Sequence, residues 1–122
     1  MACNIKQRLL GLILVLLMAP LAAQDLKVMS YNIKYDNVND TVNNWNLRKE
    51  AMVQLLKHYE PHFVGLQEVV HHQLTYLDTH LDRYAPIGVG RDDGKEKGEY
   101  SPILYNTSVF KLLKANTFWL SP

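Results

Sequence analysis

Cysteine is almost absent from this chain, since the 122 residues include one cysteine, Cys3, close to the N-terminus. We expect Cys3 to be removed with a signal peptide, so no disulfide can form in the mature chain. Because Cys3 does not lie at the expected cleavage junction, a lipid-anchored cysteine is also disfavoured. The sequence contains no internal repeat, heptad pattern or low-complexity tract, which argues against repeat architectures and coiled coils.

A strong excess of charge of one sign is missing as well. The sequence has 13 basic and 12 acidic residues. Loss of Lys6 and Arg8 with the first 24 residues would leave 11 basic and 12 acidic residues, a net charge of −1. Proteins that depend on non-specific affinity for nucleic acid usually carry a basic surface. The composition therefore gives no support to such a partner, although it leaves room for a local basic patch.

The N-terminal stretch has the layout of a secretory signal peptide. Residues 1–8 are basic, residues 9–18 are apolar and uncharged, and small residues follow up to position 24. A membrane anchor is the alternative, but the apolar run is short for a bilayer span. We expect cleavage after Ala23 or Gln24 and an exported product, secreted or periplasmic, without a stable membrane anchor. The remaining 98 of the 122 residues, 25–122, are long enough to form a core.

The order of predicted elements is typical of an α/β fold. Residues 26–33 predict a strand, and apolar side chains at helical spacing predict an amphipathic helix over residues 45–59, ended by Pro61. Residues 62–67 predict a second strand, apolar enough to be buried on both faces. This strand–helix–strand order indicates a crossover unit with parallel strands.

The elements predicted further along the chain are shorter. We predict a helix over residues 71–81, a strand over residues 84–89 and a strand over residues 100–105. Between the two strands lies a charged, glycine-rich loop, which is not a phosphate-binding loop because no Gly-Lys-Ser/Thr follows it. Residues 109–120 predict one further strand or two short ones.

Two of the predicted strands end in polar residues that suit a cation site. Asn32 lies near the end of the first strand, and Glu68 follows the second. In α/β folds, ligands bind outside the carboxyl ends of the strands, and the oxygens of Asn and Glu can hold a hard cation there. A divalent cation beside a phosphate ester is the outline of a hydrolytic site. Two core strands with polar ends by chance are the alternative, and this pattern alone leaves both interpretations open.

Four stretches, taken in order, resemble the start of the endonuclease/exonuclease/phosphatase superfamily, which has the DNase I-like fold. They are residues 29–33 (MSYNI), 45–49 (WNLRK), 61–69 (PHFVGLQEV), and 88–94 with 98–105 (GVGRDDG and GEYSPILY), extended by FWLS at 118–121. The set covers essentially the whole mature chain. The resemblance implies the N-terminal part of a two-sheet DNase I-like α/β sandwich and a metal-dependent phosphoesterase.

The resemblance also implies roles for individual residues. Glu68 would be the acidic ligand of the catalytic Mg²⁺, for which Mn²⁺ could substitute, and Asn32 would contact the metal's water shell or the scissile phosphate. Glu99 would lie near the catalytic His and steady it, and Arg91 would contact a phosphate of the substrate. A single carboxylate at a strand tip suits Mg²⁺, which often takes only one or two carboxylates and keeps several waters.

The sequence departs from the family pattern in three ways. His62 stands where the family usually has Asp after Pro, at the start of the strand and away from its metal end. Lys34 stands where some nucleases of the family place an acid, which puts a second metal at that position in doubt. The Asp-x-Asn and Ser-Asp-His motifs of the family do not occur, and neither partner of a catalytic Asp–His pair can be assigned. The resemblance therefore implies the first third to half of a domain, and we expect the 122-residue chain to be inactive alone.

Several interpretations stay open at this point. The phosphate-ester substrate could be nucleic acid, a phospholipid of the sphingomyelin type, or a sugar or inositol phosphate. A non-catalytic secreted binding or interaction domain that keeps the fold is the alternative function. We interpret Trp45 as a packing anchor and Arg48 as a structural ion-pair partner. His71 and His72 are interpreted as solvated helix residues rather than zinc ligands, because adjacent helix positions do not face each other.

Overall fold

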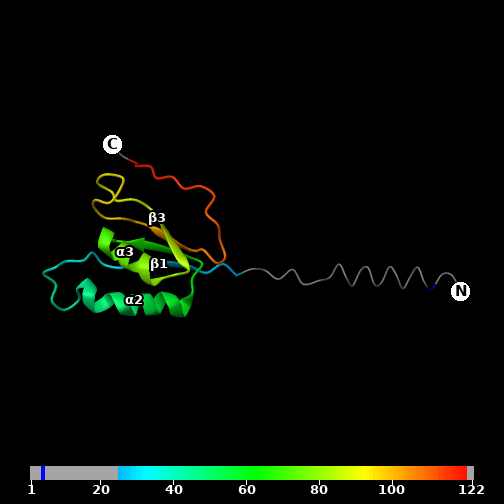
Figure 1. Cartoon of the computed structure of the whole chain (residues 1–122), viewed down its shortest axis with the longest axis horizontal. Helices are drawn as coiled ribbons and strands as arrows, with labels where there is room; N and C mark the ends of the chain where they lie inside the picture. The colour runs from blue at the N-terminus through cyan, green and yellow to red at the C-terminus, as the bar shows by residue number, and fades with distance from the viewer. Residues whose placement is uncertain (1–3, 5–24, 121–122) are drawn as a thin grey trace.

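The computed structural model describes residue 4 and residues 25–120, so the predicted signal peptide lies, apart from Asn4, outside the described residues (Figure 1). The elements follow in the order β1 (Val28–Asn32), α2 (Trp45–Tyr59), β2 (Phe63–Gln67), α3 (His71–His80), β3 (Tyr84–Ile87) and β4 (Ile103–Asn106). Among the described residues, neither helix has the length and apolar character needed to cross a bilayer.

The four strands form one sheet in the order β1-β2-β4-β3. β1 and β2 are parallel, with Val28 opposite Phe63 and Asn32 opposite Gln67. β4 pairs antiparallel with both β2 and β3. The parallel pair confirms the predicted strand–helix–strand unit, and the mixed sheet with its helices confirms the predicted α/β class.

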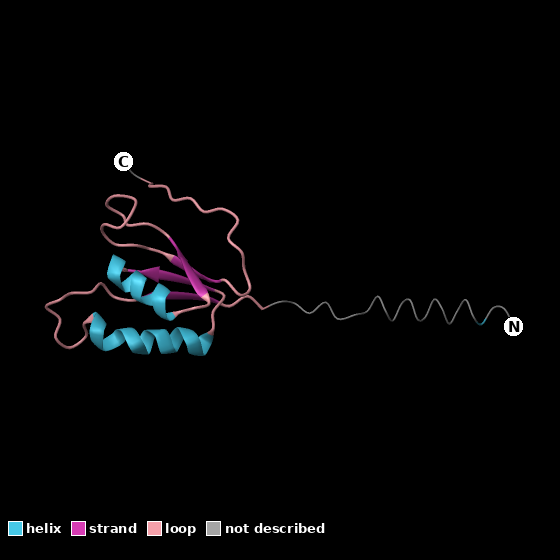
Figure 2. Ribbon diagram, viewed as in Figure 1, coloured by secondary structure: helices cyan, strands magenta, loops and turns pink. Residues whose placement is uncertain are grey.

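Both helices pack against one side of the sheet, and the coil after β4 runs along the other side (Figure 2). The apolar residues of α2 and α3 meet the inward-facing residues of β2 and β4 in one core. Its fully buried members include Leu56 of α2, Val64 and Leu66 of β2, Leu77 of α3 and Leu104 of β4. The alternation along β2 places Val64 and Leu66 toward the helices, as the period of two in a strand requires.

Helix α2 begins and ends as its flanking residues predict. The side chain of Asn44 accepts a hydrogen bond from the Leu47 N–H, which satisfies one of the free donors at the helix start. Glu60 ends the helix in a left-handed conformation, and Pro61 cannot continue it. Trp45 is 3% exposed and packs edge-on against Tyr76 of α3 at 5.7 Å between ring centroids. The packing role predicted for Trp45 is therefore confirmed.

The predicted strand at residues 109–120 was wrong. Residues 110–119 are irregular, and those after Phe110 are exposed. A strand needs a neighbour for its backbone N–H and C=O groups, and no strand of the described sheet is paired with this segment. The apolar residues here resemble a strand in sequence, but pairing rather than propensity decides whether a strand forms.

Smaller differences concern the faces and ends of the strands. β2 is not buried on both faces, because the helices cover one face, and Phe63, Gly65 and Gln67 on the other face are partly exposed. β4 begins at Ile103 rather than at residue 100, and Tyr100 instead makes an isolated bridge with Val69. The remaining predicted elements are present, with ends shifted by at most two residues.

Candidate functional site

The structure brings Asn32 and Glu68 into direct contact. The parallel pairing places Asn32, the last residue of β1, opposite Gln67, the last residue of β2. Glu68 follows Gln67 directly and therefore lies at the same edge of the sheet. The side-chain nitrogen Nδ2 of Asn32 donates a hydrogen bond of 2.8 Å to Oε1 of Glu68. Both side chains are exposed, so the pair lies open to solvent at the carboxyl ends of two strands.

Glu68 of this pair and the nearby Lys34 have left-handed backbone conformations. Lys34 has φ of 63° and Glu68 has φ of 58°. Left-handed backbone is unfavourable for residues with a Cβ, and such residues cluster at functional sites. The turn at Lys34 sends the Tyr35 N–H to Oε2 of Glu68 at 3.1 Å. Each carboxylate oxygen of Glu68 therefore accepts one hydrogen bond, from Asn32 and from Tyr35.

The orientation of the Asn32 amide follows from its two neighbours. Its oxygen Oδ1 accepts from the Lys34 N–H at 2.8 Å, while its nitrogen donates to Glu68. A rotated amide would place a donor against the Lys34 donor and an acceptor against the Glu68 carboxylate. Asn32 thus presents its nitrogen to Glu68 and keeps the carboxylate in place.

The surroundings of Glu68 favour its ionised form. The hydrogen bond from Asn32 is the largest cause that holds the pKa of Glu68 below its ordinary value, followed by the Tyr35 N–H. The positive charge of Lys34 lowers this pKa further. At neutral pH the site therefore carries a negative charge on a carboxylate with free lone pairs, which is the donor type that Mg²⁺ prefers.

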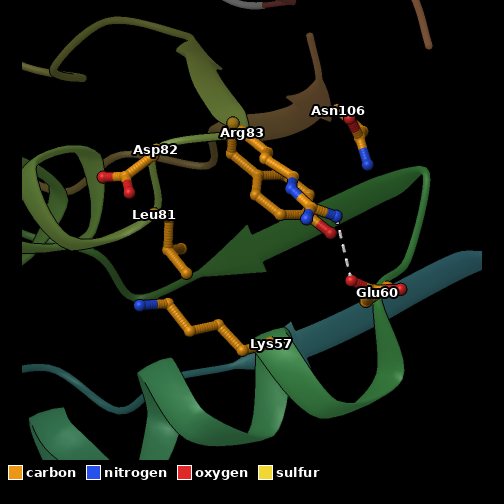
Figure 3. Close-up of a pocket in the computed structure, with 7 residues that line it drawn as sticks. Lys57, Glu60, Leu81, Asp82, Arg83 and Asn106 are labelled. Carbon is orange, nitrogen blue, oxygen red and sulfur yellow. Dashed lines mark hydrogen bonds and ion pairs between the residues drawn. The ribbon is translucent and has the colours of Figure 1, made fainter. Parts of the chain in front are cut away.

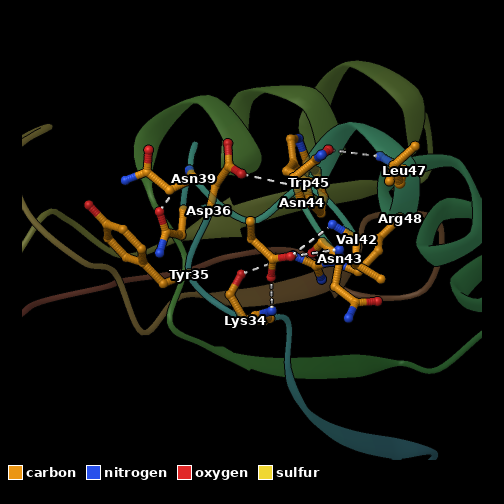
Figure 4. A network of polar contacts seen from close by, with 12 residues as sticks. Lys34, Tyr35, Asp36, Asn39, Val42, Asn43, Asn44, Trp45, Leu47 and Arg48 are labelled. Atoms are coloured by element: carbon orange, nitrogen blue, oxygen red, sulfur yellow. Dashed lines mark hydrogen bonds and ion pairs between the residues drawn. The ribbon is translucent and has the colours of Figure 1, made fainter.

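The ammonium of Lys34 forms an ion pair with Asp40. That contact, together with the Asn43 N–H, lowers the pKa of Asp40 to about 2. Figure 4 shows the loop from Lys34 to Arg48, in which these contacts hold the chain between β1 and α2. Lys34, which stands where the resemblance places an acid in some nucleases, is thus held in a structural ion pair.

Arg91 and Glu99 lie together on the glycine-rich loop. The Arg91 N–H donates to the Glu99 carbonyl oxygen at 3.0 Å, and their side chains approach to 3.8 Å. Both residues line a cleft with Tyr35 and His72. Because Tyr35 also contacts Glu68, this cleft adjoins the Asn32–Glu68 pair. All four predicted site residues therefore belong to one region of the surface.

His72 has an aspartate partner that sequence spacing does not indicate. Nε2 of His72 lies 2.8 Å from Oδ2 of Asp36, and the two residues are 36 positions apart. Oδ1 of Asp36 accepts from the Trp45 N–H at 3.1 Å, so this aspartate also supports the start of α2. No local pattern of the sequence indicates the pair, because it depends on how α3 packs beside the loop after β1.

The residues present fit part of a Mg²⁺ site. Within residues 25–120, no group of three or more His, Cys, Asp or Glu side chains gathers closely enough to hold a metal ion. A single carboxylate flanked by an amide agrees with the way Mg²⁺ is bound, by one or two carboxylates and several waters. It agrees less well with zinc, whose structural sites have four protein ligands.

A second pocket lies at the opposite end of β2 (Figure 3). Side chains of both charges line it, with Lys57 and Arg83 as cations and Glu60 and Asp82 as anions. Arg83 and Glu60 form an ion pair of 3.1 Å, the dashed line in Figure 3. None of the predicted site residues lines this pocket.

Comparison with known proteins agrees with the fold. The model of the endonuclease/exonuclease/phosphatase family matches residues 29–115. The chain is 45% identical to the endonuclease/exonuclease/phosphatase from Bacteroides vulgatus, with a TM-score of 0.77 over 81% of this chain and 38% of that one. It is 39% identical to a mannosyl-6-phosphatase from Bacteroides thetaiotaomicron, with a TM-score of 0.75 over 80% of this chain and 37% of that one.

A more distant solved relative is D. rerio TDP2 in complex with a single-strand DNA product. It is 25% identical, with a TM-score of 0.54 over 68% of this chain and 30% of that chain. No curated protein sequence matches significantly. The chain thus spans between 30% and 38% of the length of these solved relatives.

Proposed function

The chain belongs to the endonuclease/exonuclease/phosphatase family, and from that membership we propose that it contributes to an exported, metal-dependent hydrolase of phosphate esters. The hydrogen-bonded Asn32–Glu68 pair, in which Glu68 and the nearby Lys34 have left-handed backbone, is the observation that carries the proposal. Strained backbone of this kind is expected where a side chain must be presented for chemistry rather than for packing.

Glu68 is the residue that would hold Mg²⁺ or Mn²⁺, and Asn32 would keep its carboxylate oriented. The lowered pKa of Glu68 keeps the carboxylate ionised for this task. When bound, a divalent cation neutralises charge on the phosphate group and stabilises the leaving oxygen. The Asn32 nitrogen and the Tyr35 N–H occupy one lone pair on each carboxylate oxygen and leave the others available.

Arg91 and Glu99 would act on the substrate side of the cleft. The guanidinium of Arg91 is exposed and has only long ion-pair contacts, 3.4 Å to Asp92 and 3.8 Å to Glu99. A phosphate oxygen could therefore replace these contacts with a better charge-assisted hydrogen bond. The Glu99 carboxylate would orient the catalytic histidine that the family resemblance implies.

We propose a phosphorylated sugar as the first substrate class to test. The mannosyl-6-phosphatase is 39% identical over 80% of this chain, whereas the DNA-bound relative is 25% identical over 68%. The mature net charge of −1, from 11 basic and 12 acidic residues, also gives no support to a nucleic-acid substrate. Nucleic acid and phospholipid are the competing substrates in the same assay.

A non-catalytic binding domain is the alternative. It would not require Glu68 to be ionised and held by two donors, so the geometry of the site argues against it. Because the chain spans 37% of the length of the mannosyl-6-phosphatase and lacks the further family motifs, we expect no turnover from the 122 residues alone. The hydrolase and the binding domain must therefore be distinguished by an experiment on a complete domain.

A chimaera provides that complete domain. Residues 25–120 would replace the matching segment of the mannosyl-6-phosphatase, and phosphate release from mannose 6-phosphate would be measured with Mg²⁺ and with EDTA. We expect metal-dependent turnover, reduced about a hundredfold or more by Glu68→Gln, which keeps the shape of the side chain but removes its charge. Glu60→Gln, at the far pocket, is the matched control and should leave turnover unchanged.

The outcomes separate the two functions. A chimaera that melts cooperatively but lacks turnover would favour the binding domain over the hydrolase. Turnover that Glu68→Gln leaves unchanged at saturating Mg²⁺ would reject the assignment of Glu68. Faster hydrolysis of an oligonucleotide or of sphingomyelin than of mannose 6-phosphate would overturn the proposed substrate class while leaving the hydrolase. For these two diesters the cleaved products are measured, because diester hydrolysis releases no inorganic phosphate.

A further inference from the structure

The turn after β1 directs its N–H groups and its carbonyl groups to different partners. The Ile33 N–H continues the sheet ladder to Gln67 at 3.1 Å. The next two N–H groups, of Lys34 and Tyr35, bond to the side chains of Asn32 and Glu68. The carbonyl oxygens of Ile33 and Lys34 instead accept hydrogen bonds from side chains on the two helices. The geometry of the site thus depends on what holds these carbonyl groups.

Arg48 of α2 binds both carbonyl groups of the turn. Its Nη1 donates to the Ile33 oxygen at 2.6 Å and its Nη2 lies 3.4 Å from the Lys34 oxygen. Its Nε donates to the Asn43 oxygen at 2.7 Å, so the guanidinium joins the start of the loop to its end (Figure 4). The predicted ion pair of Arg48 was wrong, because the ion pairs of the described residues do not include it.

Gln73 of α3 holds the same turn from inside the core. Its side chain is fully buried at 0% exposure, and its Nε2 donates to the Lys34 oxygen at 3.1 Å. Its Oε1 accepts from the Val70 N–H at 3.0 Å, two residues after Glu68. A buried amide is costly unless both ends are bonded, so Gln73 fixes the distance between Lys34 and the chain that follows Glu68.

These contacts explain how a lysine keeps a left-handed backbone. Lys34 has φ of 63°, a conformation that persists only where the surrounding structure holds it. The Lys34 carbonyl has two bonded partners, one from each helix, and its N–H has a third in Asn32. None of the three partners is adjacent to it in sequence.

We propose that Arg48 and Gln73 are positioning residues for the Glu68 site: by fixing the Ile33–Lys34 carbonyl groups, they hold Asn32 and the Tyr35 N–H against the carboxylate. This inference rests on the proposed function, because the site that they position is the one assigned to the metal. Neither side chain touches Glu68, so their effect on metal binding passes through the turn. Partners of this indirect kind typically change metal affinity by about 10- to 100-fold.

The first test is amide hydrogen exchange at Tyr35 in the full chain, without metal. Arg48→Lys keeps the charge but loses the planar fork that reaches several oxygens. Gln73→Glu keeps the acceptor for Val70 but loses the donor to Lys34. Each variant should raise the exchange rate of the Tyr35 amide about tenfold, the effect of losing one or two hydrogen bonds. Exchange in the centre of β2 should stay unchanged.

The second test is the affinity for Mn²⁺ of the chimaera described above, measured by the electron paramagnetic resonance of the free ion. The expected result is about 10-fold to 100-fold weaker binding in Arg48→Lys and Gln73→Glu. Arg83→Lys and Gln54→Glu are matched controls, because they change the same residue types at exposed positions away from the turn. Both controls should bind Mn²⁺ as the unmodified chimaera does.

Each outcome decides one of the two claims. Unchanged Mn²⁺ affinity in folded variants overturns the positioning role, even if exchange at Tyr35 becomes faster. If the unmodified chimaera binds no Mn²⁺, the assigned metal site fails, while faster exchange at Tyr35 still supports control of the turn by Arg48 and Gln73. Gln73→Glu could lose protection from amide exchange throughout the sheet because it buries a charge. In that case Gln73→Met, which is uncharged and similar in size, and Arg48→Lys decide whether the positioning role holds.

Discussion

Gly90 is the residue at which a single added methyl group should do most damage to the loop that carries Arg91 and Glu99. A Cβ at Gly90 would lie 2.3 Å from the Lys97 carbonyl oxygen and 2.7 Å from the Lys97 nitrogen. Both are backbone atoms, so the contact cannot be relieved by a side-chain rotation. The two sides of the loop must separate by about 1 Å to reach ordinary van der Waals distance.

The expected cost follows from this displacement. Separation would weaken the hydrogen bonds from the Gly90 N–H to the Lys95 oxygen, 2.9 Å, and from the Gly94 N–H to the Gly90 oxygen, 3.0 Å. Each such bond contributes about 1 kcal/mol net, and overpacking of this kind typically costs about 1–3 kcal/mol. We therefore expect Gly90→Ala to destabilise the loop by about 2 kcal/mol, which corresponds to roughly 30-fold faster amide exchange.

The assay is amide exchange at Asp92, whose N–H bonds to the Lys97 oxygen at 3.1 Å, together with thermal unfolding. Gly65→Ala is the control, because a Cβ there meets only the Gln67 side chain at 3.9 Å. We expect that control to change stability by less than about 0.5 kcal/mol. Equal exchange at Asp92 in the two variants would refute the argument from close backbone approach.

Three further predictions concern other parts of the chain. The pKa of Asp40 is lowered from 3.8 to about 2, so its contribution to stability is present above pH 3.8 and is lost as the pH falls toward 2. The melting temperatures of the unmodified chain and of Asp40→Asn should therefore become equal near pH 2. A difference that persists at that pH would contradict the assignment. Leu56→Ala, at 0% exposure, should cost about 2–5 kcal/mol in urea unfolding, whereas Leu113→Ala, at 90% exposure, should cost less than about 0.5 kcal/mol. Mass spectrometry of exported material should find the mature N-terminus at Gln24 or Asp25, and recovery of the intact N-terminus from a membrane fraction would count against export.

The sequence by itself predicted most of the framework. Helix α2 has the predicted bounds, Trp45–Tyr59, because apolar spacing and Pro61 are both local signals. The parallel pairing of β1 and β2 follows from the strand–helix–strand order. That pairing is also why Asn32 and Glu68 could be expected at one edge of the sheet before any coordinates were known.

Only the tertiary structure decided the contacts that shape the site. The hydrogen bonds from Tyr35 to Glu68, from Gln73 to Lys34, and from His72 to Asp36 join residues 33, 39 and 36 positions apart. Local windows of sequence report propensity and periodicity, and they carry no record of which distant side chain will face a given carbonyl group. The same limit explains residues 109–120, where a strand-like pattern stays irregular because a strand requires a paired neighbour. The left-handed backbone of Lys34 and Glu68 was unpredictable for this reason too, since non-glycine residues adopt it only when packing from elsewhere in the fold enforces it.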